Sequence, residues 1–307
     1  MTWITNFLAS DIIMAAPLLI CALGALFGEK SGIINIGYEG LMIAGAFFGV
    51  VVSWISGSVL AGALAAMFAA MLLNLLFAFF VIHLHANQVV AGLAINILAT
   101  GITTTLNRSI FGASAMVPTI DVFDRLPVPL LSRLPVLGNT VFNQYIVVYA
   151  ALLFVPVSSF IFNRTHIGLK VRSVGEHPQA CDTLGINVYM VRYGGQIAAG
   201  LAAGLSGAFI SMGQLSFFVE GMVAGRGFMA LAAVVFGNFT PAGVLGASLL
   251  FGAADALKYR LQTTVTWIPY QAWLILPYLI TLVALAAYHR RSNSPASQGI
   301  PYFKGGD

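Results

Sequence analysis

Charged side chains are scarce in this chain, and their scarcity excludes an ordinary soluble protein. Only 8% of its 307 residues are Asp, Glu, Lys or Arg, whereas 59% are hydrophobic and the mean hydropathy is +0.91. A soluble domain carries about a quarter charged residues. The sequence therefore predicts a polytopic membrane protein, an all-α helix bundle of about nine spans that forms one transmembrane domain over residues 1–307.

Cysteine pairs and catalytic motifs are lacking as well. Cys21 in an apolar run and Cys181 in a polar one suggest neither a disulfide framework nor a metal site. The chain has no GxSxG, HExxH or Walker A motif, and His83 and His85 have no carboxylate nearby in the sequence. Residues 1–10 contain no Lys or Arg, so no cleaved signal peptide is expected. We expect no enzyme activity, catalytic residue, metal or cofactor, and any ATP hydrolysis belongs to another chain.

Hydrophobic runs fill most of the sequence. The nine expected spans cover residues 12–27, 33–54, 59–82, 87–105, 145–162, 193–212, 222–236, 243–257 and 267–288. Each approaches the roughly 20 residues that cross a bilayer, although the seventh and eighth are short. Pro156 and Pro277 fall inside spans, where they are expected to kink the helix. Longer polar stretches occupy residues 108–142 and 164–192 and the tail 289–307.

Basic residues set the expected orientation. If the loop 164–192 is cytoplasmic, eight Lys and Arg residues lie inside: Lys30, Arg164, Lys170, Arg172, Arg192, Arg290, Arg291 and Lys304. Five then lie outside: Arg108, Arg125, Arg133, Lys258 and Arg260. The bias predicts the N-terminus outside and the C-terminus in the cytoplasm. The formal net charge of +4 reflects loops that face anionic lipid and does not indicate nucleic acid.

The polar loop 164–192 has the pattern of a structured segment. Gly175 precedes the tripeptide Glu176–Pro178, in which an acidic residue and a proline suit a first helical turn. Gly185 then closes a helix of about two to three turns. Such a helix is a good docking surface for a soluble partner. An ordinary basic loop that only sets topology is an equally open interpretation.

Two segments form a weak internal repeat. GYEGLMIAGAFFG at residues 37–49 and GRGFMALAAVVFG at residues 225–237 each begin with glycines around a charged residue, Glu39 or Arg226, and end in Phe-Gly. In the expected topology the two copies run in opposite directions, which is an inverted repeat of the kind found in transporters. Chance similarity between glycine-rich membrane segments is the alternative.

Polar side chains inside the spans are the candidates for function. One face of the fourth span carries polar and small residues three or four apart: Gln88, Gly92, Asn96, Thr100, Thr103 and Asn107. This face is the wall of a polar pathway or a set of interhelical hydrogen bonds. Glu39 and Arg226 are charges within spans, which indicates function or else an ion pair or headgroup contact. Gly200 and Gly204 form a GxxxG packing face.

Three segments resemble the permease subunits of ABC importers. GEKSGIINIGYEGLMIAGAFF, residues 28–48, is similar to the E-[KR]-x-G-x-x-N-I-G-x-E-G segment of the nucleoside branch of the branched-chain amino acid, ribose and nucleoside permease family. Residues 168–188 resemble its cytoplasmic coupling segment, and residues 221–257 resemble its second-half signature. Where the sugar branch has Asp-Leu-Ser-Val-Gly, this chain has Asn-Ile-Gly-Tyr-Glu-Gly, which favours nucleosides. Cys181 and Tyr38 depart from the family pattern, and Tyr38 could alter substrate preference.

The resemblance implies a permease subunit of an ATP-driven importer in a bacterial cytoplasmic (inner) membrane. Its partners are a cytoplasmic ABC ATPase, an extracytoplasmic substrate-binding protein and a second permease, with a heterodimer favoured. The implied ATPase-coupling residues are Arg172, Gly175, Glu176, His177, Pro178, Asp182, Leu184 and Gly185. The residues expected to line the substrate path are Asn35, Tyr38, Glu39, Gln88, Asn96, Phe217 and Arg226. Transport of simple sugars of the ribose type and, from another class, a passive polar-solute channel remain alternatives.

Overall fold

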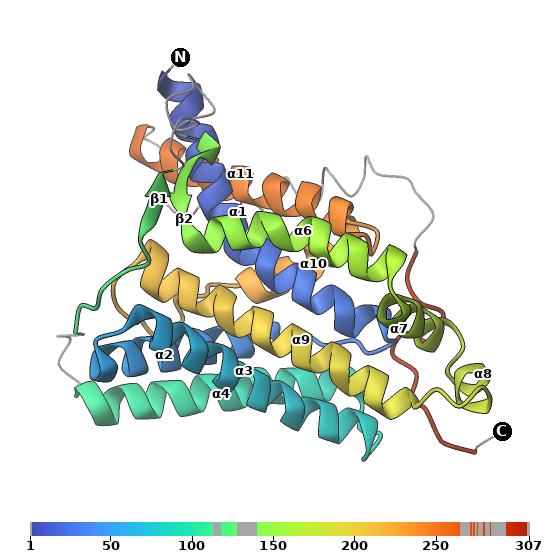
Figure 1. The fold of residues 1–307 in the computed structure, drawn as a ribbon. Helices are drawn as coiled ribbons and strands as arrows, with labels where there is room; N and C mark the ends of the chain where they lie inside the picture. Colours follow the sequence, from blue (N-terminus) through green and yellow to red (C-terminus); the bar gives the residue numbers. More distant parts are fainter. Residues whose placement is uncertain are drawn as a thin grey trace.

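The computed structural model describes residues 2–112, 118–127, 140–264 and 293–305, with positions 271, 273, 275, 279 and 283. This part of the chain is a helical bundle with one small sheet (Figure 1). The helices are α1 (Thr2–Lys30), α2 (Tyr38–Ser56), α3 (Val59–Ile82), α4 (Gln88–Phe111), α6 (Ile146–Arg164), α7 (His166–Glu176), α8 (Pro178–Thr183), α9 (Val188–Phe209) with its π-helical end η2 (Ile210–Gln214), α10 (Arg226–Phe236) and α11 (Pro241–Thr264). The strands β1 (Arg125–Pro127) and β2 (Asn143–Tyr145) pair antiparallel.

Six helices among the described residues are long and apolar enough to cross a membrane: α1, α2, α3, α4, α6, and α9 with η2. The helical membrane bundle is thus confirmed, and the third expected span, 59–82, coincides with α3. The expected count of nine is not reached within these residues. The seventh expected span holds only the 11-residue α10, and the 24-residue α11 of the eighth is not among the six. The ninth, 267–288, lies outside the described residues apart from isolated positions.

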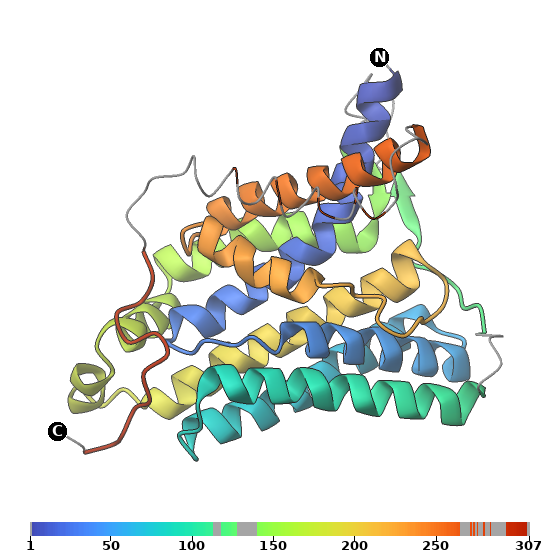
Figure 2. The same cartoon turned by 180° about the vertical axis from the view of Figure 1, so that it is seen from behind.

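The long helices run between two ends of the bundle, and different short elements lie at each end. Figure 1 shows the N-terminus at one end of the bundle, together with β1 and β2. The short helices α7 and α8 and the C-terminus lie at the opposite end. Figure 2 shows the C-terminal residues passing along that second end. Polar elements are therefore gathered at both ends, as a membrane protein requires.

Small residues let the central helices pack closely. The spanning windows of α1 and of α9 with η2 are each 78% buried, more than any other span. A side chain at Gly204 of α9 would overlap the Ala66 carbonyl oxygen of α3, and one at Gly207 would overlap the Met42 carbonyl oxygen of α2. These backbones approach too closely for any residue with a Cβ. The expected packing face on this helix is confirmed.

Two of the expected spans are discontinuous. The second was expected from residue 33, but α2 begins only at Tyr38, after the buried, non-helical residues 31–37. The seventh was expected from residue 222, but α10 begins only at Arg226, after the non-helical residues 215–225. We call these two stretches the α2 entry segment (31–37) and the α10 entry segment (215–225). Hydrophobicity alone does not distinguish an extended apolar stretch from a helical one, which explains the difference.

Both helices start at the same position of the sequence repeat. Gly37 is the N-cap of α2 and Gly225 is the N-cap of α10, each the first residue of its copy. The far end of α2 contacts α4 through the ring pair Trp54–Phe111. Asn238, just after α10, instead contacts Asn293 near the C-terminus. The two helices therefore point toward opposite ends of the bundle from starting points that meet.

Candidate substrate path and coupling region

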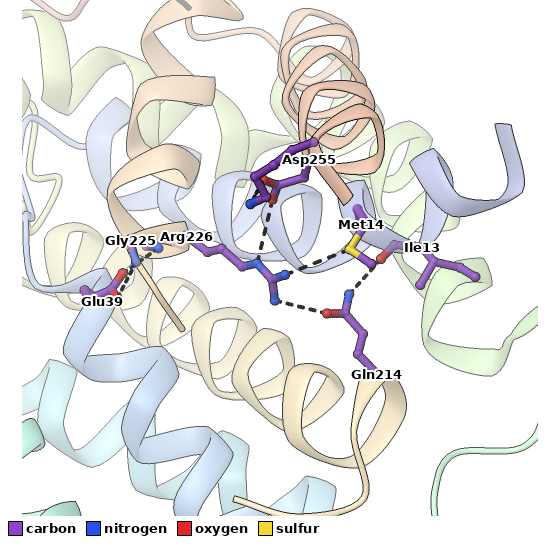
Figure 3. A network of polar contacts seen from close by, with 9 residues as sticks. Ile13, Met14, Glu39, Gln214, Gly225, Arg226 and Asp255 are labelled. Carbon is purple, nitrogen blue, oxygen red and sulfur yellow. Dashed lines mark hydrogen bonds and ion pairs between the residues drawn. The ribbon is translucent and has the colours of Figure 1, made fainter. Parts of the chain in front are cut away.

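Glu39 connects the starts of α2 and α10. Its Oε1 accepts a hydrogen bond from the Gly225 amide and its Oε2 accepts one from the Gly227 amide, each at 2.8 Å (Figure 3). The first amides of a helix have no partner within the helix, and a negative charge there is favourable. A Cβ at Gly227 would overlap the Glu39 backbone, so this glycine permits the contact. The carboxylate thus joins the two discontinuous spans.

Arg226 belongs to a separate charged cluster on the other side of α10. Its Nη1 donates to Gln214 Oε1 at 3.0 Å, and its Nε lies 4.0 Å from Asp255 Oδ2 (Figure 3). Asp255 also pairs with Lys258, whose Nζ lies 2.7 Å from Oδ1. Arg226 is only 8% exposed and Asp255 only 3%. The ion pair of Arg226 is therefore with Asp255 of α11 and not with Glu39, so the two charges singled out from the sequence have different partners.

Asn35 lies in a buried network of amide side chains. Its Nδ2 donates to Asn74 Oδ1 at 2.7 Å, and its Oδ1 accepts from the Gly37 amide at 2.7 Å. Asn74 in turn donates to the Gln196 backbone carbonyl at 2.6 Å and to its Oε1 at 3.0 Å. Asn35, Asn74 and Gln196 are completely buried. The network joins the α2 entry segment to α3 and α9.

Gln88 and Asn96 of α4 hold the same entry segment from its other side. The Ile34 amide donates to Gln88 Oε1 at 2.7 Å. Asn96 accepts from the Gly40 amide at 2.7 Å and donates to the Ile36 carbonyl at 2.9 Å. Irregular backbone inside a membrane is tolerated only when its polar groups find partners. At these two positions the geometry matches the hydrogen-bonding interpretation of the polar stripe.

Tyr38 and Phe217, two of the residues expected to line the substrate path, do not face an open cavity in the described part of the chain. Tyr38 is completely buried in the core, and its hydroxyl has no hydrogen-bond partner among the described residues. Phe217 is half-buried in the α10 entry segment, next to Phe218, whose ring lies 5.2 Å from that of Phe47. A hollow of about 420 Å³ between α1, α3, α6 and α9 has apolar walls. None of the expected path residues lines that hollow.

The cytoplasmic loop expected from the sequence contains two helices in place of one. Glu176 is the last residue of α7, and Pro178 is the first of the six-residue α8. Proline disfavours helical backbone in the residue before it, and His177 accordingly has φ −140° and ψ 80°. The expectation of a helix of two to three turns with Glu176 in its first turn is therefore wrong. Gly185 does end this region, at φ +79°.

The expected coupling residues divide into an outer and an inner set. Arg172, His177 and Gly185 are exposed, and Leu184 is 80% exposed. Pro178 is buried and Asp182 is half-buried. Gly175 packs against the Lys30 carbonyl, and Glu176 Oε2 accepts from the Ala296 amide at 3.3 Å. Gly175 and Glu176 thus contact the remainder of this chain, although Glu176 is itself exposed, while the outer set is available to a partner.

The sequence interpretation missed several buried polar residues that organise these contacts. Asn74, Gln196 and Asp255 each lie within an expected span, so a polar side chain in a long apolar run was the available signal. Glu29 stands in the segment that carries the family resemblance but was not singled out, and its partner Gln298 had no comparable signal. Gln298 lies in a Ser- and Pro-rich tail that has no hydrophobic period.

The sequence is similar to permease subunits of known transporters. The family described as "Branched-chain amino acid transport system / permease component" matches residues 7–285. The "Guanosine ABC transporter permease protein NupQ" of Bacillus subtilis is 41% identical over 96% of both chains. The "Putative glucose ABC transporter permease protein TsgC13" of Haloferax volcanii is 36% identical over 86% of this chain and 80% of its own. The "Nucleoside ABC transporter permease protein NupC" of Lactococcus lactis is 32% identical over 96% of both chains. No solved structure matches the chain significantly.

Proposed function

Because the chain belongs to the branched-chain amino acid transport system permease component family, we propose that it is the permease subunit of an ABC importer for nucleosides. The observation that carries the substrate class is the 41% identity to a guanosine permease over 96% of both chains. The permease itself is not an enzyme, and a separate subunit hydrolyses ATP. The family implies a cytoplasmic ATPase and a substrate-binding protein as partners.

The junction of α2 and α10 supports a transport role. Discontinuous spans whose helix N-termini meet inside the membrane are typical of transporter binding and gating regions. Here the junction is closed by Glu39, which accepts from the amides of Gly225 and Gly227. Two helices that begin at this junction can separate more readily there than two continuous spans. The junction is therefore the part of the subunit best suited to open and close.

The substrate path is proposed at a face shared with a second permease. Glu39 and Asn96 are half-buried at the junction, Thr100 of α4 is exposed, and Phe228 of α10 is 44% exposed. Polar groups that face lipid are costly, so this face fits a protein interface or an aqueous path better than lipid. Hydrogen-bonding groups beside an aromatic ring suit a nucleoside, which offers hydroxyls and a flat base. A heterodimer of two different permeases would enclose the path.

Nine crossings and an outside N-terminus are proposed for the membrane arrangement. The six spanning helices supply six crossings, and the α10 entry segment with α10 supplies a seventh. α11 supplies the eighth, and the ninth rests on the apolar sequence 267–288. Basic residues at the end that carries α7 and α8 favour its location in the cytoplasm. This orientation places the expected ATPase-docking surface around α8 inside a bacterial cytoplasmic (inner) membrane.

Cysteine labelling tests this orientation. Leu184→Cys is suited to the experiment because Leu184 is 80% exposed, while Cys21 and Cys181 are buried. A membrane-impermeant maleimide should label the variant in inside-out vesicles and leave it unlabelled in intact cells. Labelling in intact cells would mean that the orientation is reversed.

Reconstituted transport tests the function. The complete importer in proteoliposomes should accumulate radiolabelled guanosine only when ATP and the binding protein are present. Unlabelled adenosine or uridine should compete, whereas ribose, glucose and leucine should not. Guanosine entry without ATP would instead establish a passive channel.

A simple sugar is the second candidate substrate. Its support is the 36% identity to a relative described as a glucose permease. The same competition assay separates the two candidates. Glucose or ribose uptake that guanosine does not inhibit would replace the nucleoside assignment.

A further inference from the structure

The last described residues of the chain form an ordered connection across one end of the bundle. We call residues 293–303 the C-terminal strap (Figure 2). At its start the Asn293 amide donates to Asn238 Oδ1 at 2.7 Å. At its end His85 Nε2 lies 3.1 Å from the Tyr302 carbonyl oxygen, and the rings of His85 and Phe303 stack at 4.2 Å. The strap therefore reaches from the turn after α10 to the loop between α3 and α4.

Tyr302 ties the strap to the expected coupling helix. It is 3% exposed and packs in a small apolar cluster with Val174 of α7, Cys181 of α8 and Val188 of α9. Burial raises the pKa of the Tyr302 phenol to about 12, so the ring stays neutral in this cluster. A displacement of α8 would act directly on this ring, because the cluster contains Cys181.

Gln298 ties the strap to the α2 entry segment. Its Nε2 donates to Glu29 Oε2 at 2.5 Å, while Glu29 Oε1 accepts from the Asn35 amide at 3.2 Å. The Gly299 amide donates to the Gly32 carbonyl at 3.0 Å. Glu29 is 1% exposed, and a hydrogen bond to a buried carboxylate is among the stronger ones. The strap thus bonds both the beginning of the entry segment and the side chain that holds Asn35.

The middle of the strap is fixed to the end of α7. Ser297 donates to the Gly175 carbonyl through its amide at 2.9 Å and through its hydroxyl at 2.6 Å. Turns within the strap add bonds from Gln298 to the Pro295 carbonyl and from Ile300 to the Ser297 carbonyl. A short segment with internal turns and contacts at both ends moves as a unit more readily than a flexible tail.

We propose that the C-terminal strap carries the movement of α8 to the two discontinuous spans, with Gln298 and Tyr302 as its positioning residues. The strap contacts the α2 entry segment directly through Gly299 and, by way of Glu29 at the end of α1, through Gln298. It contacts the turn after α10 through Asn293. These are the inner ends of the two spans whose other ends meet at Glu39. A displacement of α8 is thereby delivered to both sides of the junction. The proposal rests on the proposed docking of the ATPase at α8.

The test measures coupling in the complete importer, assembled with its ATPase, second permease and binding protein in proteoliposomes. Gln298→Ala removes the bond to Glu29 and leaves α8 untouched. Guanosine-stimulated ATP hydrolysis should persist, while guanosine transported per ATP should fall about tenfold. Lys304→Ala is the matched control, because Lys304 is exposed and has no hydrogen bond or ion pair to the described residues. This control should keep the parental ratio.

Two further variants distinguish a strap that transmits the movement of α8 from one that only stabilises the fold. Asn238→Gly tolerates the φ of +50° at this turn while removing the acceptor for Asn293, and it should lower the same ratio. The double variant Glu29→Gln with Gln298→Glu exchanges the amide and the carboxylate, so it should recover most of the ratio lost in Gln298→Ala.

Each outcome decides the proposal. If Gln298→Ala transports guanosine with the parental amount per ATP, the strap does not transmit movement. If abundance, ATP hydrolysis and uptake fall together at an unchanged ratio, the strap only stabilises the fold and the proposal is wrong. A parental importer without ATP-dependent guanosine uptake would instead refute the proposed function, and the strap variants would not be needed to show it.

Discussion

The two entry segments reach the same junction by different means. The α2 entry segment is mostly buried, and its backbone is held by side chains of surrounding helices, among them Gln88, Asn96 and Glu29. The α10 entry segment is more exposed, although Phe218 and Val223 are buried, and its turns close on its own backbone, as in the bond from the Met222 amide to the Val219 carbonyl. Glu39 supplies one of its few bonds to another element.

This difference indicates which half of the junction moves. A segment with few buried contacts and exposed backbone opens at lower free energy than one bonded from several sides. Ala224 also has φ +52°, a strained value for a residue other than glycine. We infer that the α2 entry segment keeps its internal shape and shifts as a unit, which makes it the fixed half, whereas the α10 entry segment rearranges and is the moving half. The charged cluster around Arg226 then anchors α10 while its entry segment rearranges.

The largest expected effect comes from breaking that anchor. Asp255→Asn removes the carboxylate between Arg226 and Lys258 and leaves the buried Arg226 cation beside the half-buried Lys258 cation. An uncompensated buried charge costs about 3–5 kcal/mol, so the thermal unfolding temperature in detergent and the membrane abundance should both fall. Lys258→Met, which keeps the Arg226–Asp255 pair, should cost much less. Equal losses in the two variants would show that the cluster does not act through Asp255.

A smaller effect is expected from the fixed half. Asn74→Ala removes the acceptor of Asn35 Nδ2 and the donor to Gln196, both completely buried. Each unsatisfied buried group costs about 1–3 kcal/mol. The thermal unfolding temperature should therefore fall, while Ser58→Ala, at the half-buried cap of α3, serves as a mild control at the other end of the same helix. An unshifted Asn74→Ala would mean that the entry segment does not depend on the amide network.

The junction itself should respond in transport more than in stability. Glu39→Gln keeps one amide acceptor and loses the charge at the start of α10, which is worth about 1 kcal/mol. The protein should insert at parental abundance but lose most ATP-dependent guanosine uptake. Parental uptake in this variant would remove Glu39 from the mechanism. Abundance that falls in step with uptake would make its role purely structural.

The smallest effect is expected from an exposed pair at the outer end of the moving half. Arg108 Nε lies 3.0 Å from Glu220 Oε1, with Arg108 63% and Glu220 34% exposed in their side chains. Surface ion pairs contribute little because water and salt screen them. Glu220→Gln should leave both unfolding and uptake unchanged at physiological salt. A marked loss of uptake would show that this pair restrains the α10 entry segment.

Spans and the repeat were predictable from sequence for a clear physical reason. Apolar runs of bilayer length can be counted, and α3 begins and ends where its run does. The glycine and the charge at the head of each repeat copy are local signals, and both helices start beside them. The break before α2 was hidden because residues 33–37 are as apolar as a helix.

The candidate site was less predictable because its contacts join distant parts of the chain. Sequence could identify Glu39 and Arg226 as unusual, but not that Gly225 and Asp255 are their partners. It also assigned Glu176 to a docking helix, whereas its carboxylate accepts from Ala296, 120 positions away. The roles of the path and coupling residues in transport remain predictions that the variants above address.

The C-terminal strap has a consequence for biosynthesis. Glu29 leaves the ribosome early, yet its partner Gln298 is made 269 residues later. Asn238, Gly175 and His85 likewise await contacts that only the last residues provide. Insertion of the first spans therefore precedes completion of the end that carries α7 and α8, and the Glu29 side chain has no Gln298 partner until translation is nearly finished. A ribosome stalled before residue 293 would leave a subunit that spans the membrane but whose end at α7 and α8 is still incomplete and accessible to proteases and chaperones.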